Sequence, residues 1–233
     1  MSNSDERWVA AIAALAGSVL LFVGTYLHPL EADPNDVPAA FAEYAADRLW
    51  VASHLTQLAG VVLMVGALVL VSWMMRRGPA AGWALLGAIG AVASLAVTAA
   101  LQAVDGVALK VMVDTWAAAA EANKAAVFQA AFAVRQIEIG LAAIVSLLFG
   151  ATVTVYGIAF IVDRSLPRWL GWLAIVGGVP TAVAGVVMAH TGFSGAAMAI
   201  SMPASSLLLL WMIALGVMIW RHAGARSDEK SAA

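Results

Sequence analysis

Apolar residues fill most of the chain in long blocks, and polar residues gather in the short segments between the blocks. The stretch from Trp50 to Met75 shows this pattern most clearly, because it is almost wholly apolar and ends at Arg76 and Arg77. It exceeds the roughly 20 residues that a helix needs to cross the hydrocarbon core of a bilayer. The pattern therefore predicts a transmembrane helix, with His54 and Gln57 near its start and the arginine pair at its end.

Five further apolar blocks are long enough to span a membrane, which predicts an all-α, polytopic helix bundle in a single domain of residues 1–226. The expected spans cover about residues 8–28, 50–75, 80–104, 126–161, 169–190 and 196–220. Residues 227–233 are polar and predict a loose cytoplasmic tail. Between the first two spans, Asp36 followed by Pro38 predicts a short amphipathic helix at about residues 36–49, with its apolar face on the membrane surface.

The distribution of basic residues predicts the orientation of the bundle. Six spans put both termini on one side, and the segments on that side contain twice as many basic residues as the segments on the other. The first group is Arg7, Arg76, Arg77, Arg164, Arg168, Arg221, Arg226 and Lys230; the second is Arg48, Lys110, Lys124 and Arg135. Because short loops rich in Lys and Arg stay in the cytoplasm, we expect both termini to be cytoplasmic.

The composition agrees with a membrane protein and excludes several other classes. Hydrophobic residues make up 63% of the chain, charged residues make up 11%, and the mean hydropathy is +0.92. A soluble domain would contain about 25% charged residues. The net charge of -2 and the lack of a run of basic residues argue against nucleic-acid binding. The absence of cysteine excludes disulfides, thiolate metal ligands and cysteine nucleophiles.

Most polar residues of the spans lie toward the side away from the termini. They are the histidines His28, His54 and His190, together with Gln57, Gln102, Asp105, Arg135 and Glu138. Three pairs, His54/Gln57, Gln102/Asp105 and Arg135/Glu138, have a spacing of three residues, so the members of each pair can point the same way. Since ionisable groups inside a membrane usually face the bundle interior, we expect a polar pocket in the outer leaflet. Within it we expect Arg135 and Glu138 to form a salt bridge.

Imidazoles from several helices are a common way to hold a transition-metal ion or a haem iron in a helix bundle. We expect either His54 and His190 to bind haem as an axial pair, or His28, His54 and His190 to bind a metal ion. Both sites would suit a role in electron transfer. The chain has no His-x-x-x-His or Glu-x-x-His spacing, so this expectation depends on separate helices converging.

Two other functions fit the same residues. The acidic groups and His54 offer a proton relay, and Pro180 and Pro203 predict the interrupted helices of a proton-coupled transporter of a small solute. A non-catalytic membrane subunit or scaffold is the other alternative, because small residues such as Gly87 and Gly90 allow close packing within the chain, in a homo-oligomer or with a partner subunit. The chain has no Gly-x-Ser-x-Gly motif, and the sequence does not decide whether the protein is an enzyme.

Several short motifs resemble those of small bacterial integral-membrane proteins of unknown function. They are His28-Pro29, Trp50-Val-Ala-Ser-His54-Leu, Asp105-Gly-Val-Ala-Leu-Lys110, Val134-Arg-Gln-Ile-Glu138 and Leu166-Pro-Arg-Trp-Leu-Gly-Trp172. The resemblance covers most of the chain. It implies the six-span layout in a bacterial cytoplasmic membrane, in contact with lipid, and brings no activity, substrate or cofactor with it.

Overall fold

The computed structural model describes residues 3–29 and 31–231, and every regular element within these ranges is a helix. The elements are α1 (Asn3–Tyr26), α2 (Val37–Ala46), α3 (Trp50–Met75), α4 (Ala81–Gln102), the π-helical segment η1 (Ala103–Leu109), α5 (Lys110–Ala118), α6 (Glu121–Asp163), α7 (Arg168–Thr191) and α8 (Gly195–Ser231). Six helices are long and apolar enough to cross a membrane, and α4, η1 and α5 together form one of them. The predicted all-α, six-helix membrane bundle is confirmed.

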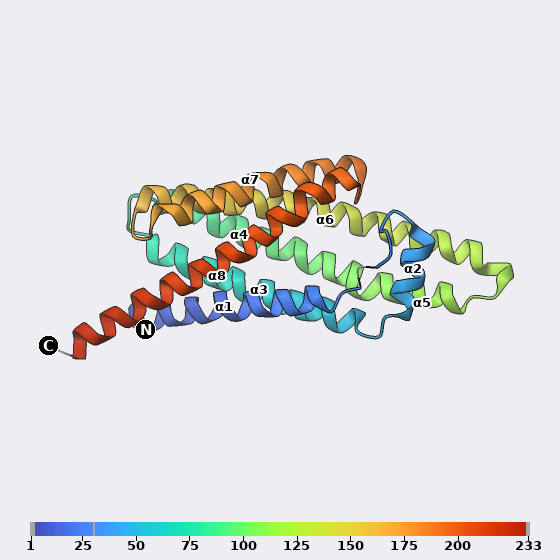
Figure 1. The fold of residues 1–233 in the computed structure, drawn as a ribbon, viewed down its shortest axis with the longest axis horizontal. Helices are drawn as coiled ribbons and strands as arrows, with labels where there is room; N and C mark the ends of the chain where they lie inside the picture. Colours follow the sequence, from blue (N-terminus) through green and yellow to red (C-terminus); the bar gives the residue numbers. More distant parts are fainter. Residues whose placement is uncertain (1–2, 30, 232–233) are drawn as a thin grey trace.

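The long helices run roughly along one axis (Figure 1). Helix α1 packs on α3, α6 packs on α4 and α7, and α8 crosses the bundle to contact α1 and α7. Both termini lie at one end of the bundle, termed the terminal end, and the turn between α5 and α6 lies at the opposite, distal end. An even number of spans requires this arrangement. The cytoplasmic location of the terminal end stays a prediction from the basic residues.

Glycines let the helix backbones approach closely. A Cβ atom added at Gly24 of α1 would lie 2.7 Å from the Ser53 carbonyl oxygen of α3. A Cβ atom added at Gly150 of α6 would lie 2.6 Å from the Gly178 carbonyl oxygen of α7. Lipid chains are as apolar as leucine, so van der Waals packing of this kind drives association between membrane helices. The contact at Gly24 also fixes His28, one turn further along the chain, relative to the start of α3.

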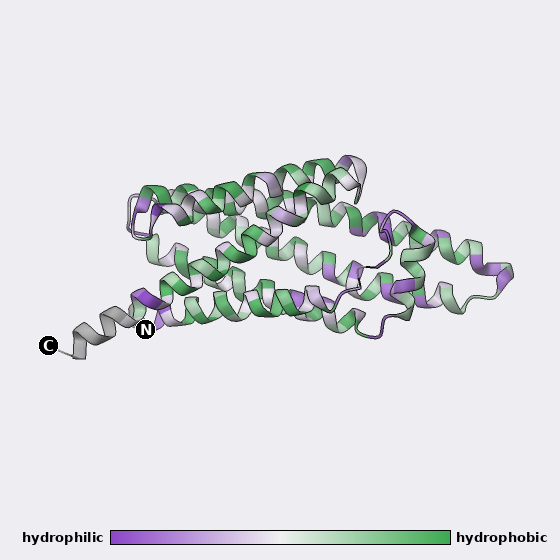
Figure 2. Cartoon of the chain, viewed as in Figure 1, coloured by the Kyte–Doolittle hydropathy of each residue, from purple (hydrophilic) through white to green (hydrophobic). Residues whose placement is uncertain are grey.

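Two of the helices are much longer than a membrane is thick. Helix α6 has 43 residues and the continuous Ala81–Ala118 helix has 38, which correspond to about 65 Å and about 57 Å. The hydrocarbon core measures only about 30 Å. Both helices project at the distal end, where hydrophilic residues lie among apolar ones (Figure 2). The projecting part, made of α2, α5 and the adjoining part of α6, is termed the distal extension. The third expected span ends at residue 104 and the fourth begins at residue 126, whereas the helices continue beyond both limits. Hydropathy shows where the apolar core ends, but not where a helix ends.

Helix α2 packs on the rest of the distal extension and not on the membrane surface. Its buried side chains Phe41 and Tyr44 join a cluster with residues of α3, η1, α5 and α6. The Asp36 carboxylate accepts a hydrogen bond from a backbone N–H of the first turn and caps the helix start. At the other end, Lys110 Nζ donates to two carbonyl oxygens of the last turn, both at 2.9 Å. Protein therefore covers the apolar face that was expected on the membrane surface, because α5 and α6 reach far enough to meet it.

Helix α8 continues past residue 220, the expected end of the sixth span. Its backbone is helical to Ser231, whereas the sequence predicted a loose tail over residues 227–233. Alanine, arginine, glutamate and lysine are good helix formers, and their frequency in this part of the sequence favours a helical backbone. Residues 232–233 of the predicted tail lie outside the described residues.

Candidate metal centre

Three potential metal ligands from different segments lie together at the base of the distal extension. His28 follows the end of α1, His54 lies in the second turn of α3, and Asp105 lies in η1. One ligand atom from each residue lies within 4.8 Å of the other two. The close contact of α1 with α3 and the packing of α3 on η1 bring these residues together.

The His54 side chain is almost fully buried, with 2% of its surface exposed. Its Nδ1 atom lies 2.7 Å from the Trp50 carbonyl oxygen, and its Nε2 atom lies 3.1 Å from Asp105 Oδ2. A carbonyl oxygen only accepts hydrogen bonds, so Nδ1 carries the proton of the neutral ring. The lone pair of Nε2 then faces a carboxylate oxygen. This contact is stable only when a proton or a metal ion lies between the two atoms.

His28 is arranged in a similar way. Its Nδ1 atom lies 2.7 Å from the Pro29 carbonyl oxygen, which leaves Nε2 as the ligand atom of the neutral ring. The centroids of the His28 and His54 rings are 5.1 Å apart. Burial lowers the pKa of His28 below its ordinary value of 6.5, and this effect outweighs the hydrogen bond to Pro29. The ring is therefore neutral at pH 7, which is the form that binds a metal ion.

Asp105 is positioned by the π-helical segment and by Trp50. The Trp50 indole Nε1 donates to the Asp105 carbonyl oxygen at 2.9 Å, which ties η1 to the start of α3. The next residue, Gly106, lies against His54, and a Cβ atom there would lie 2.5 Å from His54 Cβ. The Asp105 Oδ1 atom is buried and has no hydrogen-bond partner among the described residues. Because buried polar atoms are nearly always paired, this oxygen is available to a ligand.

The distances suit a shared metal ion after a small contraction. Two ligand atoms bound to one ion at about 2.0–2.2 Å lie roughly 3.0–3.5 Å from one another. The 3.1 Å between His54 Nε2 and Asp105 Oδ2 already falls in this range. The three ligand atoms lie within 4.8 Å of one another, so His28 needs to move inward by at most about 1–2 Å. Its position just after a helix end, beside a loop, allows that movement.

Two further polar pairs lie close to the metal ligands. Gln102 Nε2 donates to Gln57 Oε1 at 3.1 Å. Since α3 and the α4–η1 helix run in opposite directions, His54 contacts Asp105 and Gln57 contacts Gln102. Arg135 and Glu138 form a buried ion pair at 2.6 Å. The Arg135 guanidinium also lies over the Tyr44 ring, 5.5 Å from its centroid. The carboxyl groups of Glu138 and Asp105 are near enough to interact electrostatically.

His190 does not join this group. It is exposed at the end of α7 and lines a separate cavity of about 380 Å³ with Arg135, Gln136 and Phe193. Of the expected metal ligands, His28 and His54 are brought together, and Asp105 occupies the third place in the group. The structure therefore brings His54 together with His28 and a carboxylate, and not with His190, the axial partner expected for a haem.

Two residues that position the group were not found from the sequence. Trp50 was interpreted as part of an apolar span, although its indole N–H requires an acceptor when buried. Gly106 follows Asp105 directly. A glycine next to a polar residue in a span indicates that another helix can approach the backbone closely there. Both act by fixing η1 against the first turns of α3.

No protein-family model, no curated protein and no solved structure matches the chain. The interpretation of the site therefore depends on its own geometry.

Proposed function

We propose that this membrane protein binds one transition-metal ion through His28 Nε2, His54 Nε2 and the Asp105 carboxylate. The observation that supports the proposal is the buried contact between His54 Nε2 and Asp105 Oδ2 at 3.1 Å. In the neutral ring this nitrogen has no proton to donate, because Nδ1 donates to Trp50. A metal ion supplies the positive charge that joins the two ligand atoms.

The ligand types indicate the class of ion. Two imidazoles and one carboxylate, without thiolates, suit borderline divalent ions such as Fe²⁺, Co²⁺ and Zn²⁺. Each imidazole donates its Nδ1 proton to a backbone carbonyl, as metal-bound histidines commonly do. Three protein ligands leave positions open for water or a substrate, which is typical of catalytic and transport sites and not of closed structural ones. A metal ion uses the carboxylate, whereas a haem with two axial imidazoles does not, so we propose an ion and not a haem.

A second candidate is proton transfer, which the same contact favours. A proton between His54 and Asp105 would also hold the pair together, and the buried Glu138 lies near enough to interact with Asp105. Such a chain of titratable groups is typical of proton-coupled transporters. Asp105→Asn removes a metal ligand and also a proton acceptor, so this variant alone does not distinguish the two candidates. Metal binding and proton-coupled uptake therefore have to be measured separately.

Metal titration of the purified protein tests the proposal. The protein in detergent is stripped with a chelator and titrated with Co²⁺, whose absorption spectrum reports imidazole and carboxylate ligands, and elemental analysis counts the bound ions. We expect about one ion per chain, and at least about tenfold weaker binding in H28Q, H54Q and D105N. The controls H190Q and H222Q change histidines outside the group and should bind as the unchanged protein does.

Two results would contradict the metal proposal. One is unchanged binding in both H54Q and D105N, with circular dichroism showing that each variant remains helical. The other is a loss in H190Q as large as the loss in H54Q. If no ion binds and D105N abolishes proton-coupled uptake in liposomes, proton transfer is the function of the site.

A further inference from the structure

Asp47 lies in the short turn between α2 and α3, and one oxygen of its carboxylate is buried without a partner. Its Oδ1 atom accepts a hydrogen bond from the Leu49 backbone N–H at 2.7 Å, which fixes the carboxylate at the start of α3. Its Oδ2 atom is buried and has no hydrogen-bond partner among the described residues. Buried polar atoms are nearly always paired. This oxygen therefore requires a donor or a cation that the described residues do not supply.

The Asp47 carboxylate lies close to the two imidazoles of the candidate metal centre. It is near enough to interact electrostatically with both His28 and His54. Three residues further along the chain, the Trp50 ring packs 4.7 Å from the His28 ring and 4.6 Å from the His54 ring, measured between centroids. The turn that contains Asp47 therefore leads directly into the part of α3 that packs on the imidazoles.

Two basic side chains of the distal extension already have acidic partners. They form the pairs Lys110–Asp114 at 2.8 Å and Arg135–Glu138 at 2.6 Å. Neither Asp47 nor Asp105 forms an ion pair with a lysine or arginine among the described residues. Arg48, next to Asp47 in the chain, is exposed to solvent. The two carboxylates beside the imidazoles are therefore not neutralised by a paired basic side chain.

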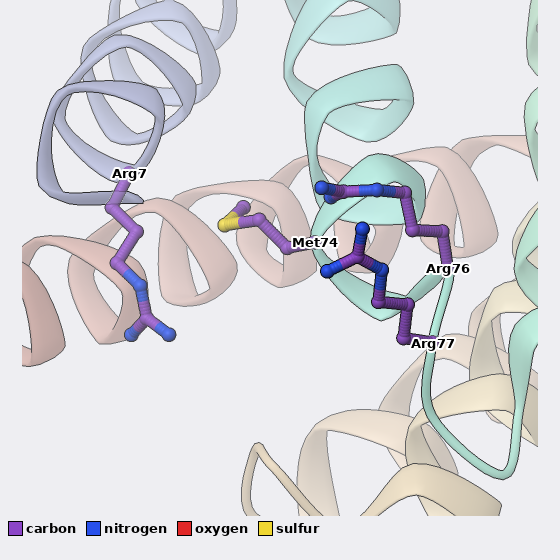
Figure 3. A pocket seen from close by; sticks show the side chains of 4 residues that line it. All are labelled: Arg7, Met74, Arg76 and Arg77. Carbon is purple, nitrogen blue, oxygen red and sulfur yellow. The ribbon is translucent and has the colours of Figure 1, made fainter. Parts of the chain in front are cut away.

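The arginines that follow α3 lie at its other end. Figure 3 shows Arg76 and Arg77 beside one another at the terminal end. The helix rises about 33 Å between His54 and Arg76. Exposed charges are largely screened beyond about 8–10 Å, so these arginines do not balance the carboxylates. Asp47 and Asp105 together carry two negative charges beside neutral imidazoles, and one divalent ion neutralises both.

We propose that Asp47 is the second carboxylate of the metal centre and accepts a hydrogen bond from a water molecule bound to the ion. This inference rests on the proposed binding of an ion by His28, His54 and Asp105. Asp47 is not one of the residues whose ligand atoms lie within 4.8 Å of one another, so a water molecule bridges it to the ion. Three protein ligands leave positions open for such a water. The Asp47 charge then strengthens the binding of a divalent ion, as carboxylates around metal ligands commonly do.

Co²⁺ titration of D47N in the full chain tests the inference. Asparagine removes the charge and keeps the turn, because its side-chain oxygen also accepts the Leu49 N–H. We expect D47N to bind Co²⁺ about tenfold more weakly. The absorption spectrum at saturation should keep its shape, since the three direct ligands are unchanged, whereas D105N should alter it. The matched control D33N changes an exposed aspartate whose Oδ1 accepts the Asn35 N–H at 2.9 Å in the same kind of turn, and it should bind as the unchanged protein does.

An unchanged Co²⁺ affinity in D47N, together with weaker binding in D105N, would overturn this inference alone and not the three-ligand site. An equal loss in D33N, or a D47N spectrum altered as much as that of D105N, would also overturn it. If the unchanged protein binds no ion, both proposals fail. If circular dichroism shows that D47N is not helical, D47S replaces it, because the serine hydroxyl accepts the same hydrogen bond without a charge. The same loss is expected in D47S, and an unchanged affinity would contradict the inference.

Discussion

The backbone of α3 holds the His54 ring in one tautomer. The Nδ1 atom lies 2.7 Å from the Trp50 carbonyl oxygen and 3.2 Å from Ser53 Oγ, which itself donates to the same carbonyl at 2.8 Å. Both neighbours therefore accept the Nδ1 proton, and the neutral ring has no second proton for Asp105. The contact between imidazole and carboxylate thus depends on whatever cation lies between them.

Replacing Gly106 by alanine tests how closely η1 must approach His54. A Cβ atom at this position would lie 2.5 Å from His54 Cβ and 2.9 Å from its Cγ, and neither is the movable end of a flexible side chain. We expect G106A to lower the free energy of unfolding by about 1–3 kcal/mol and to weaken metal binding. The control G66A adds a methyl group where no atom lies within 4 Å and should be neutral or slightly stabilising. Thermal unfolding followed by circular dichroism, with Co²⁺ titration, measures both effects. Equal stability of the two variants would contradict the prediction.

The sequence gives the polar residues of the site and their order, but not the complete ligand set. The spacing of three residues in His54/Gln57 and Gln102/Asp105 predicted that the members of each pair point the same way, and the structure joins His54 to Asp105 and Gln57 to Gln102. The position of His190 was predicted only by its depth along α7. Its direction depends on how α7 is rotated against its neighbours, which a nearly uniform apolar sequence does not specify.

At the scale of the elements, the distal extension is the least predictable part of the fold. Hydropathy identified the apolar portions of α4 and α6, but it does not show how far either helix continues beyond the apolar core. Helix α2 was predicted from Asp36 and Pro38, and its cap is as expected. Its apolar face was assigned to the membrane because the sequence does not reveal that α5 and α6 reach it. The π-helical geometry of η1 has no sequence signature that distinguishes it from an α-helix.

Lys110 anchors α2 to the rest of the distal extension, and its removal tests that role. Its Nζ atom donates to the Tyr44 and Ala45 carbonyl oxygens and to Asp114 Oδ1, all within 2.9 Å. In K110M we expect the amides of residues 37–46 to exchange hydrogen about tenfold faster or more, because a hydrogen bond from a charged donor contributes about 1.5–3 kcal/mol. Hydrogen–deuterium exchange with mass spectrometry measures the rate. The control K124M removes a cation that lies 5.5 Å over the Trp116 ring, and an equal effect in both variants would contradict a specific anchor.

At the scale of the whole molecule, the six-span bundle follows from apolar length alone. Each span is long enough to cross the bilayer, and an even number of spans brings the termini to one end (Figure 1). The orientation of the bundle in the membrane was predicted from the distribution of basic residues. The sequence contains no cysteine. A single introduced cysteine is therefore the only thiol in the protein, which allows a direct test of that orientation.

Single cysteines report the side of the membrane on which each end lies. We expect an impermeant maleimide to label A118C, at the distal end, from outside intact cells, and to label S165C, in the α6–α7 loop, only after the cells are permeabilised. The control V62C lies in the middle of α3, exposed to lipid, and should react in neither condition. Labelling of S165C in intact cells would show that the bundle has the opposite orientation.

The π-helical segment Ala103–Leu109 determines how the side chains of α5 are rotated about the helix axis relative to those of α4. On the membrane side of this turn the helix presents Gln102 to α3, and on the far side it presents Lys110 to α2. An α-helix through the same residues advances about 100° per residue, and the wider i→i+5 pattern advances less. Asp105 lies within this segment, so the direction in which its carboxylate points, toward His54, depends on the π-helical geometry.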